Sequence, residues 1–252
     1  AIVEAGLRPD MRYVPLKGVE QQDIQSLHRI RERRIKQRTQ LLNQTHGLLQ
    51  EYGIASRRGQ KALRETTALA LEDAENELTP LMRELLAEQM EELRALNEQV
   101  ARLDKRVQQL SRAVAPCRHL LALEGVGPVA ATQLYSVLGD GKAFGKGRQA
   151  SAYFALTPKQ HSSGGEVRLG GIGRTGHSQV RAALIRGAHA VIKTLGQKDD
   201  PKSRWLRALV ARVGVNKAAV ALANKTVRTA WAMLNSNQPY RRDDENALSQ
   251  VA

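Results

Sequence analysis

The residues best suited to chemistry lie in a glycine-rich segment, residues 154–177. Within it, Ser163 precedes Gly164 and Gly165, so little side-chain bulk shields its hydroxyl, which could act as a nucleophile. Arg168 and Arg174 follow closely and could clamp a phosphate. The alternative is a Ser-Gly-Gly turn in a hairpin with no catalytic role, and residue types alone favour this simpler interpretation.

The stretch that follows, residues 177–190, predicts a helix that opens with His177. Arg181 lies four residues further on, and Arg186 follows about one turn later. Residues at this spacing share one side of a helix, so the pattern predicts a basic side that could contact phosphates.

A second motif is Glu124-Gly125-Val126-Gly127-Pro128, which separates a short helix from a second one. Its two glycines permit a tight turn and let backbone N–H groups approach a phosphate. The N-terminus of the second helix, which is the positive end of its dipole, lies at the same place. The pattern is typical of a helix-hairpin-helix that contacts nucleic-acid backbone rather than bases. The alternative is an ordinary turn between packed helices.

The charge of the chain is unevenly distributed. Lys and Arg number 39 against 25 Asp and Glu, a net charge of +14, and residues 141–235 hold 17 basic residues against three acids. Such segregation favours contact with nucleic acid over a uniformly solubilising surface. A further basic run at 29–38 is either a phosphate-contacting helix or a solvated helix face. Aromatic residues make up only 4%, which disfavours platforms that stack bases on rings.

The fold class predicted from apolar spacing is mainly α, with helices over 20–52, 80–114 and 216–234 and a short helix within 54–79. The helix over 80–114 carries a heptad seam, which needs a partner to cover it. We favour a coiled coil that is partly intermolecular, with the same helix of a second subunit; the alternative is an intramolecular hairpin with the helix over 20–52. The seam residues are Leu93, Leu96, Val100, Leu103, Val107, Leu110 and Val114.

The cysteine and histidine content and the short apolar runs exclude several classes of protein. Cys117 is the single cysteine, which excludes a disulfide framework and favours a cytoplasmic protein. No metal site is predicted, because the histidines of the second half lack a carboxylate cluster. No apolar run approaches the roughly 20 residues of a membrane helix, so no membrane partner is expected. The histidines that lack a carboxylate cluster are His161, His177 and His189.

Taken in order, several motifs together resemble the C-terminal domain of bacterial insertion-sequence transposases of the DEDD type, which a bridge RNA guides. They are the Gly-Val-Gly hairpin, Ala-Tyr-Phe-Ala-Leu-Thr-Pro, Ser-Ser-Gly-Gly, Gly-Arg-Thr-Gly-His and the closing Ala-rich helix. The likeness covers about residues 10–240. It implies a mobile-element enzyme that cuts and rejoins DNA, with DNA and a guide RNA as partners and a homo-oligomer formed through the coiled coil.

The resemblance also implies residue roles. The family serine, which becomes covalently joined to a DNA end, stands directly before a glycine; that position is Ser163, with Ser162 the less favoured neighbour. Arg168, Arg174 and Arg181 would position phosphates, and Gly125 and Gly127 would hold backbone. His177, at the helix entry, is also counted among the DNA-binding residues.

The implied domains are four. Residues 1–53 would be the end of a resolvase-like N-terminal domain with a basic helix. Residues 54–115 would be a linker and coiled coil, 116–240 the C-terminal transposase domain with its helix-hairpin-helix and short Gly-rich hairpin, and 241–252 a tail.

One departure concerns the acids that bind magnesium in this family. The last two sit in an Asp-x-x-Asp segment followed by Ala-Ile, and this sequence begins at Ala1-Ile2. We therefore expect all four magnesium ligands to be absent and the chain as given to be inactive. A non-catalytic nucleic-acid-binding protein is the alternative function. A purely structural coiled-coil protein is a third, against which the basic block argues.

Overall fold

The computed structural model describes residues 2–7 and 16–240, and it is mainly helical, which confirms the predicted fold class. The predicted tail at 241–252 lies outside the described residues. The chain divides into two compact units. One is formed by residues 26–106, and the other combines residues 1–25 with residues 107–252. No helix among the described residues is long and apolar enough to cross a membrane.

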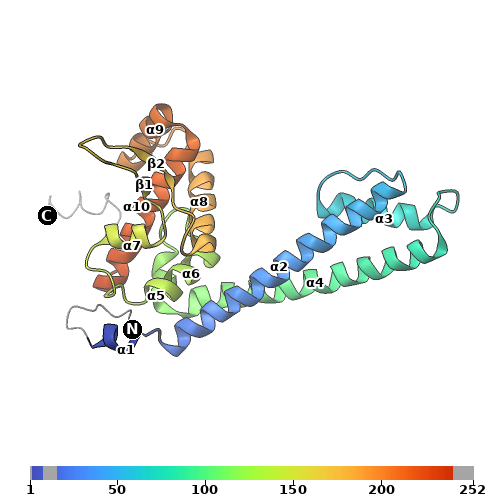
Figure 1. Cartoon of the computed structure of the whole chain (residues 1–252), viewed down its shortest axis with the longest axis horizontal. Helices are drawn as coiled ribbons and strands as arrows, with labels where there is room; N and C mark the ends of the chain where they lie inside the picture. The colour runs from blue at the N-terminus through green and yellow to red at the C-terminus, as the bar shows by residue number, and fades with distance from the viewer. Residues whose placement is uncertain (1, 8–15, 241–252) are drawn as a thin grey trace. The chain divides into compact units, whose positions relative to one another are not determined.

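The unit of residues 26–106 is a helical hairpin. Helix α2 (Val19–Glu51) and helix α4 (Pro80–Ala113) lie side by side, and the short helix α3 (Gln60–Glu72) sits between them in sequence (Figure 1). Within the unit, Leu41 of α2 packs against Leu93 and Leu96 of α4. These three helices match the ranges predicted from apolar spacing.

The heptad seam of α4 is covered within the chain. Leu93, Leu96 and Val100 are almost fully buried, and Leu41 of α2 supplies the contact to the first two. Val114, at the other end of the seam, packs with Ile24 and Cys117. The favoured prediction, that the seam pairs between subunits, is therefore not what this structure displays. The apolar pattern requires a partner, and α2 of the same chain meets that requirement.

The helical hairpin is fastened at its closed end by an arginine. The guanidinium of Arg83 donates to the backbone carbonyls of Ala70, Leu71 and Asp73 and to the side chain of Asn76. These carbonyls belong to the last turn of α3 and the residues after it, where helices leave acceptors unsatisfied. The contact fixes the loop that joins α3 to α4.

The other unit is a helical bundle built around α10 (Val215–Ser236). Helix α10 packs against α7 (Gly147–Tyr153), α8 (Ser178–Lys193) and α9 (Pro201–Val213), with α5 (Ala115–Leu120) and α6 (Pro128–Leu138) alongside. Its buried face is rich in alanine, which lets neighbouring helices approach closely. A short helix, α1 (Ile2–Gly6), belongs to the same unit.

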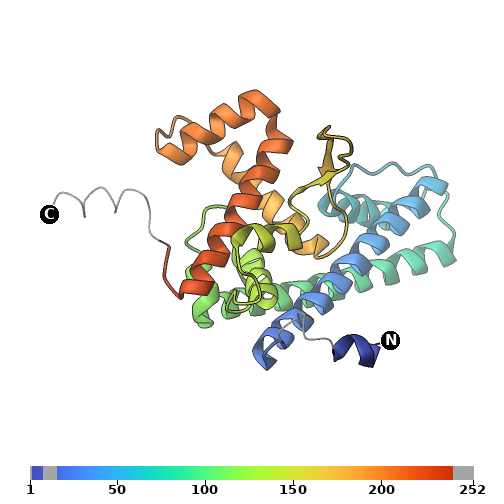
Figure 2. The same cartoon turned by 60° about the vertical axis from the view of Figure 1, so that its left-hand side comes forward.

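One small antiparallel sheet interrupts this unit. Strands β1 (Pro158–Gln160) and β2 (Leu169–Ile172) form a β-hairpin between α7 and α8. The hairpin stands away from the helices of its unit in both views (Figure 1 and Figure 2). Every residue from 158 to 171 is exposed to solvent, so the hairpin gains no stability from burial along its length.

Candidate functional site

The tip of the β-hairpin is a tight turn that carries the predicted nucleophile. Ser163 and Glu166 face each other, and the Glu166 N–H donates to the Ser163 carbonyl at 3.1 Å. The two residues between them have positive φ, 57° at Gly164 and 85° at Gly165. Two central residues with positive φ define a type I′ turn, which suits the twist of a β-hairpin and favours glycine. Both glycines are thus explained by the turn.

The two neighbouring serines differ in what their hydroxyls do. The Ser162 Oγ accepts hydrogen bonds from Gln160 Nε2 at 3.0 Å and from the backbone N–H of Arg168 at 3.2 Å. The Ser163 hydroxyl makes no hydrogen bond with any residue that the structure describes. Ser162 therefore braces the hairpin, whereas the Ser163 hydroxyl is available to a ligand.

The two arginines predicted to clamp a phosphate are both exposed. Arg168 Nη2 lies 2.7 Å from Glu166 Oε2 across the tip, with both side chains mostly in solvent. An exposed pair of this kind is worth at most about 1 kcal/mol, so a phosphate could displace Glu166 from it. The Arg174 side chain lies on the descending leg, beyond β2, and makes no ion pair within the described part of the chain.

Arg181 is placed differently from what the sequence predicted. Its side chain is buried, and its guanidinium donates to the carbonyls of Phe154, Thr175 and Arg174 at 3.0, 3.0 and 3.3 Å. Phe154 precedes β1, whereas the other two follow β2. Arg181 thus clamps both legs of the hairpin at its root and has no exposed face for a phosphate. Its prediction as a direct phosphate ligand is corrected to that of an anchor.

Asn224 is a second anchor at the root, which sequence reasoning missed. Its Nδ2 donates to the Leu156 carbonyl at 3.2 Å, which ties the ascending leg to α10. Ala155, which precedes Leu156, has a φ of 52°. The Ala155 and Leu156 N–H groups donate to the Ala152 and Ser151 carbonyls, which is the Schellman arrangement that ends α7. In the sequence, this anchor is indicated only by the polar side chain of Asn224 within an alanine-rich helix.

His177 occupies the N-cap position of α8, the helix that follows the hairpin, without a capping hydrogen bond from its side chain. As the residue before α8, it lies with its ring 5.2 Å from the ring of Tyr153 and 5.7 Å from that of Phe154, measured between centroids. Tyr153 in turn lies 5.3 Å from Phe144. The histidine therefore joins an aromatic cluster at the root of the hairpin, with Tyr153 still 46% exposed.

The Gly125-Val126-Gly127 loop joins α5 to α6, and its first glycine faces the protein interior. Gly125 has a φ of 80°, and a Cβ there would lie 2.8 Å from the Gly187 carbonyl oxygen of α8. A Cβ at Gly187 would lie 1.9 Å from the Gly125 oxygen, so the two backbones touch. This contact is that of a turn packed on a helix, and it explains the glycine at this position without a phosphate. Gly127 is open, with nothing within 4 Å of its missing side chain.

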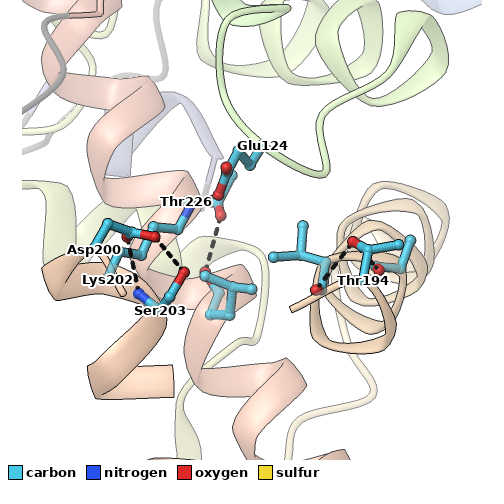
Figure 3. A network of polar contacts seen from close by, with 9 residues as sticks. Glu124, Thr194, Asp200, Lys202, Ser203 and Thr226 are labelled. Carbon is cyan, nitrogen blue, oxygen red and sulfur yellow. Dashed lines mark hydrogen bonds and ion pairs between the residues drawn. The ribbon is translucent and has the colours of Figure 1, made fainter. Parts of the chain in front are cut away.

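The same loop is tied to the start of α9. Glu124 Oε2 lies 2.7 Å from Lys202 Nζ, and this hydrogen bond holds the pKa of Glu124 below its usual value (Figure 3). Asp200 caps α9, its carboxylate accepting from the Ser203 N–H at 3.0 Å and from the Ser203 hydroxyl, and these bonds lower the pKa of Asp200. The loop is therefore held by two helices.

No group of three or more His, Cys, Asp or Glu side chains that could hold a metal ion occurs within residues 2–7 and 16–240. The magnesium that the resemblance implies therefore has no fitting ligand set in the described chain. Of the predicted residues, Ser163, Arg168, Arg174, His177 and Arg181 come together on the hairpin and its root. Gly125 and Gly127 lie elsewhere, in the loop between α5 and α6, where Gly125 contacts Gly187 of α8.

Comparison with known proteins bears on this arrangement. Residues 117–206 match the model of the transposase IS116/IS110/IS902 family. The chain is 46% identical over 245 residues to a probable family 20 transposase of Pseudomonas aeruginosa, covering 96% of this chain and 72% of that protein. It is 41% identical to the transposase for insertion sequence element IS1111A of Coxiella burnetii, covering 96% of this chain and 66% of that protein. It is 32% identical to the transposase for insertion sequence element IS1328 of Yersinia enterocolitica, at 96% and 72% coverage.

Proposed function

The chain belongs to the IS116/IS110/IS902 family of transposases, and we propose that it cuts and rejoins DNA through a covalent bond between Ser163 and a DNA end. The observation that carries the proposal is the contrast between two adjacent hydroxyls. Ser162 is committed to two hydrogen bonds, while Ser163 is exposed and free beside two glycines. Both serines are exposed, but only the Ser163 hydroxyl is not already engaged in hydrogen bonds that an attack on DNA would disrupt.

The proposed step exchanges one phosphoester bond for another. The Ser163 Oγ forms a bond to a DNA phosphorus, and the phosphorus–oxygen bond to one deoxyribose breaks. The hydroxyl proton leaves with a base, and the departing deoxyribose oxygen takes up a proton. One phosphoester replaces another, so a second DNA hydroxyl can reverse the step without ATP. Arg168 and Arg174 would hold the phosphate while its negative charge shifts.

A serine hydroxyl is a weak nucleophile and needs a group to accept its proton. The described chain offers no such group within hydrogen-bonding distance of Ser163. The chain spans 72% of the length of the Pseudomonas relative and 66% of that of the Coxiella relative. We therefore expect it to bind DNA on its own without cutting it, and to need a proton acceptor from outside the β-hairpin.

Two partners complete the proposal. Exchange of two strands needs more than one serine, so we propose that a homo-oligomer acts. We also propose that a guide RNA contacts the exposed cations of the basic run on α2, namely Arg29, Arg33 and Lys36. Lys36 forms a partly exposed ion pair with Glu32 at 3.5 Å, which a phosphate could replace. Arg31 and Arg38 of the same run are engaged within the helical hairpin, with Asp104 and Asn97.

The test is a protein–DNA adduct that survives denaturation. It is sought with the chain fused to the part of the Pseudomonas relative outside the match, in the presence of magnesium and cellular RNA. Ser163→Ala should abolish the adduct and leave DNA binding nearly unchanged, because only one exposed hydroxyl is lost. Ser162→Ala is the matched control and should retain it. An adduct in the Ser163→Ala protein, or its loss only in Ser162→Ala, would contradict the assignment.

The missing proton acceptor also favours a second function, a nucleic-acid-binding protein without catalysis. This alternative predicts salt-dependent DNA binding and no adduct in any fusion. A denaturation-resistant adduct therefore separates the two functions.

A further inference from the structure

Both tryptophans of the chain line one open groove, although they lie far apart in the sequence. The groove is formed by residues of α7, α9 and α10 and has a volume of about 900 Å³. It lies within the unit of residues 107–252, and none of the residues 158–172 of the β-hairpin lines it, although Asn224 at the root of the hairpin does. The tryptophans are Trp205 of α9 and Trp231 of α10.

The groove is lined by cations and by no acid. Lys146, Arg148, Lys225 and Arg228 line it, and all four are exposed. None of them forms an ion pair with a described residue, whereas nearby Arg207 is paired with Asp199. Four unbalanced cations on one concave surface favour a polyanion.

The two indoles have different tasks. The Trp231 N–H donates to the carbonyls of Gly141 and Phe144 at 2.9 and 3.1 Å, so this ring is a fixed wall. Trp205 has no such bond, is 37% exposed, and lies with its ring centroid 4.8 Å from Lys225 Nζ. Lys225 Nζ lies over the face of the Trp205 ring, so a flat aromatic group would stack on the indole by displacing this cation from the ring or by using the part that it leaves exposed.

We propose that this groove binds a single-stranded stretch of nucleic acid, with its phosphates on the four cations and one unpaired base stacked on Trp205. The base faces of a duplex are hidden in its stack, so only an unpaired base can use the indole. The low aromatic content of the sequence disfavoured base stacking, but composition does not show that both tryptophans line the same groove. The site is independent of Ser163, and it fits either a DNA strand opened during exchange or an unpaired segment of an RNA.

The experiment measures binding of labelled strands of about 12 nucleotides, a length within the range of single-strand sites. The probes are oligo-dT, oligo-U, an abasic deoxyribose strand and a duplex of the same length. Trp205→Leu should weaken binding of oligo-dT or oligo-U about 10-fold, since stacking one base contributes roughly 1–3 kcal/mol. It should leave binding of the abasic strand unchanged. The arm that shows the Trp205-dependent effect identifies the strand as DNA or RNA.

Further variants separate stacking, charge and folding. Trp205→Phe keeps an aromatic ring and should retain most of the affinity. Lys225→Gln with Arg228→Gln should weaken binding of every strand, abasic included. The matched control, Arg102→Gln with Lys105→Gln, removes two exposed cations of α4 and should have a clearly smaller effect. Ser163→Ala should bind as the wild type does, so failure of the nucleophile assignment would not affect this result.

Three results would overturn the proposal. The first is unchanged affinity of Trp205→Leu for both oligo-dT and oligo-U. The second is an equal loss of affinity for the duplex or the abasic strand in Trp205→Leu. The third is a loss in the α4 control as large as that in the groove double variant, since binding would then follow net charge alone.

Discussion

The two hairpins of this protein are stabilised in opposite ways. The helical hairpin of α2 and α4 buries leucines along its length, including Leu41, Leu93 and Leu96. The β-hairpin buries nothing from residue 158 to 171 and is held only at its root, where Arg181 and Asn224 bind backbone carbonyls. An exposed hairpin can therefore be held in place by hydrogen bonds at its base, without a hydrophobic core along its length.

The strongest test of this contrast removes the root anchor. Arg181→Ala should lower the free energy of unfolding by about 3 kcal/mol, because three carbonyls lose their donor and a buried side chain leaves a cavity. Arg174→Ala, which removes an exposed arginine of the descending leg, should change it by no more than about 0.5 kcal/mol. Urea denaturation of both variants measures the difference. Equal losses would show that the root is not fixed by Arg181.

The helical hairpin is expected to lose folding stability at acidic pH. Burial, and secondarily the charge of Arg31, lowers the pKa of His28 to about 4 from 6.5. The unfolded chain binds this proton near pH 6.5 and the folded protein only near pH 4, so lowering the pH through this window favours unfolding. We expect the wild type to lose about 2 kcal/mol of stability there relative to His28→Gln.

Urea titrations at several pH values between 7 and 4 measure this effect. His46→Gln, on the same helix, controls for the general loss of a histidine. A pH dependence that His28→Gln leaves intact would show that other groups cause it.

The smallest effect is expected at the tip of the β-hairpin. Gly164→Ala places a side chain at a φ of 57°, which costs about 1 kcal/mol locally. The exposed tip should open more readily, with faster amide hydrogen exchange at Glu166 and little change in global stability. Gly171→Ala is the control, because nothing lies within 4 Å of its missing side chain and its φ is not positive. Faster exchange in both variants would mean that the turn geometry is not the cause.

The sequence was informative where a pattern is local. Apolar spacing located the long helices, and Ser-Gly-Gly with its flanking residues located a hairpin, because both depend on neighbours in the chain. It predicted that the α4 seam has a partner and favoured a second subunit, but Leu41 of α2 satisfies the same pattern within the chain.

The errors concern residues whose partners are distant in the chain. Arg181 was assigned to a phosphate by its charge, although it shares a helix face with the buried residues Leu184 and Ala188. That position was the available signal for an anchor. Gly125 was assigned to a ligand by its freedom, whereas its missing side chain makes room for Gly187. No spacing rule tells which side of a glycine faces a neighbour.

Anchoring the β-hairpin only at its base makes its reach adjustable. The legs are gripped at Phe154 and Leu156 on one side and at Arg174 and Thr175 on the other. Everything between these grips is free to lengthen or shorten without disturbing the bundle. Two residues added to each strand would carry Ser163 about 6.6 Å further out on the same face, whereas one residue added to each would turn its side chain to the opposite face. Insertions and deletions in the two strands therefore change the position of the Ser163 hydroxyl while the helical bundle stays unchanged.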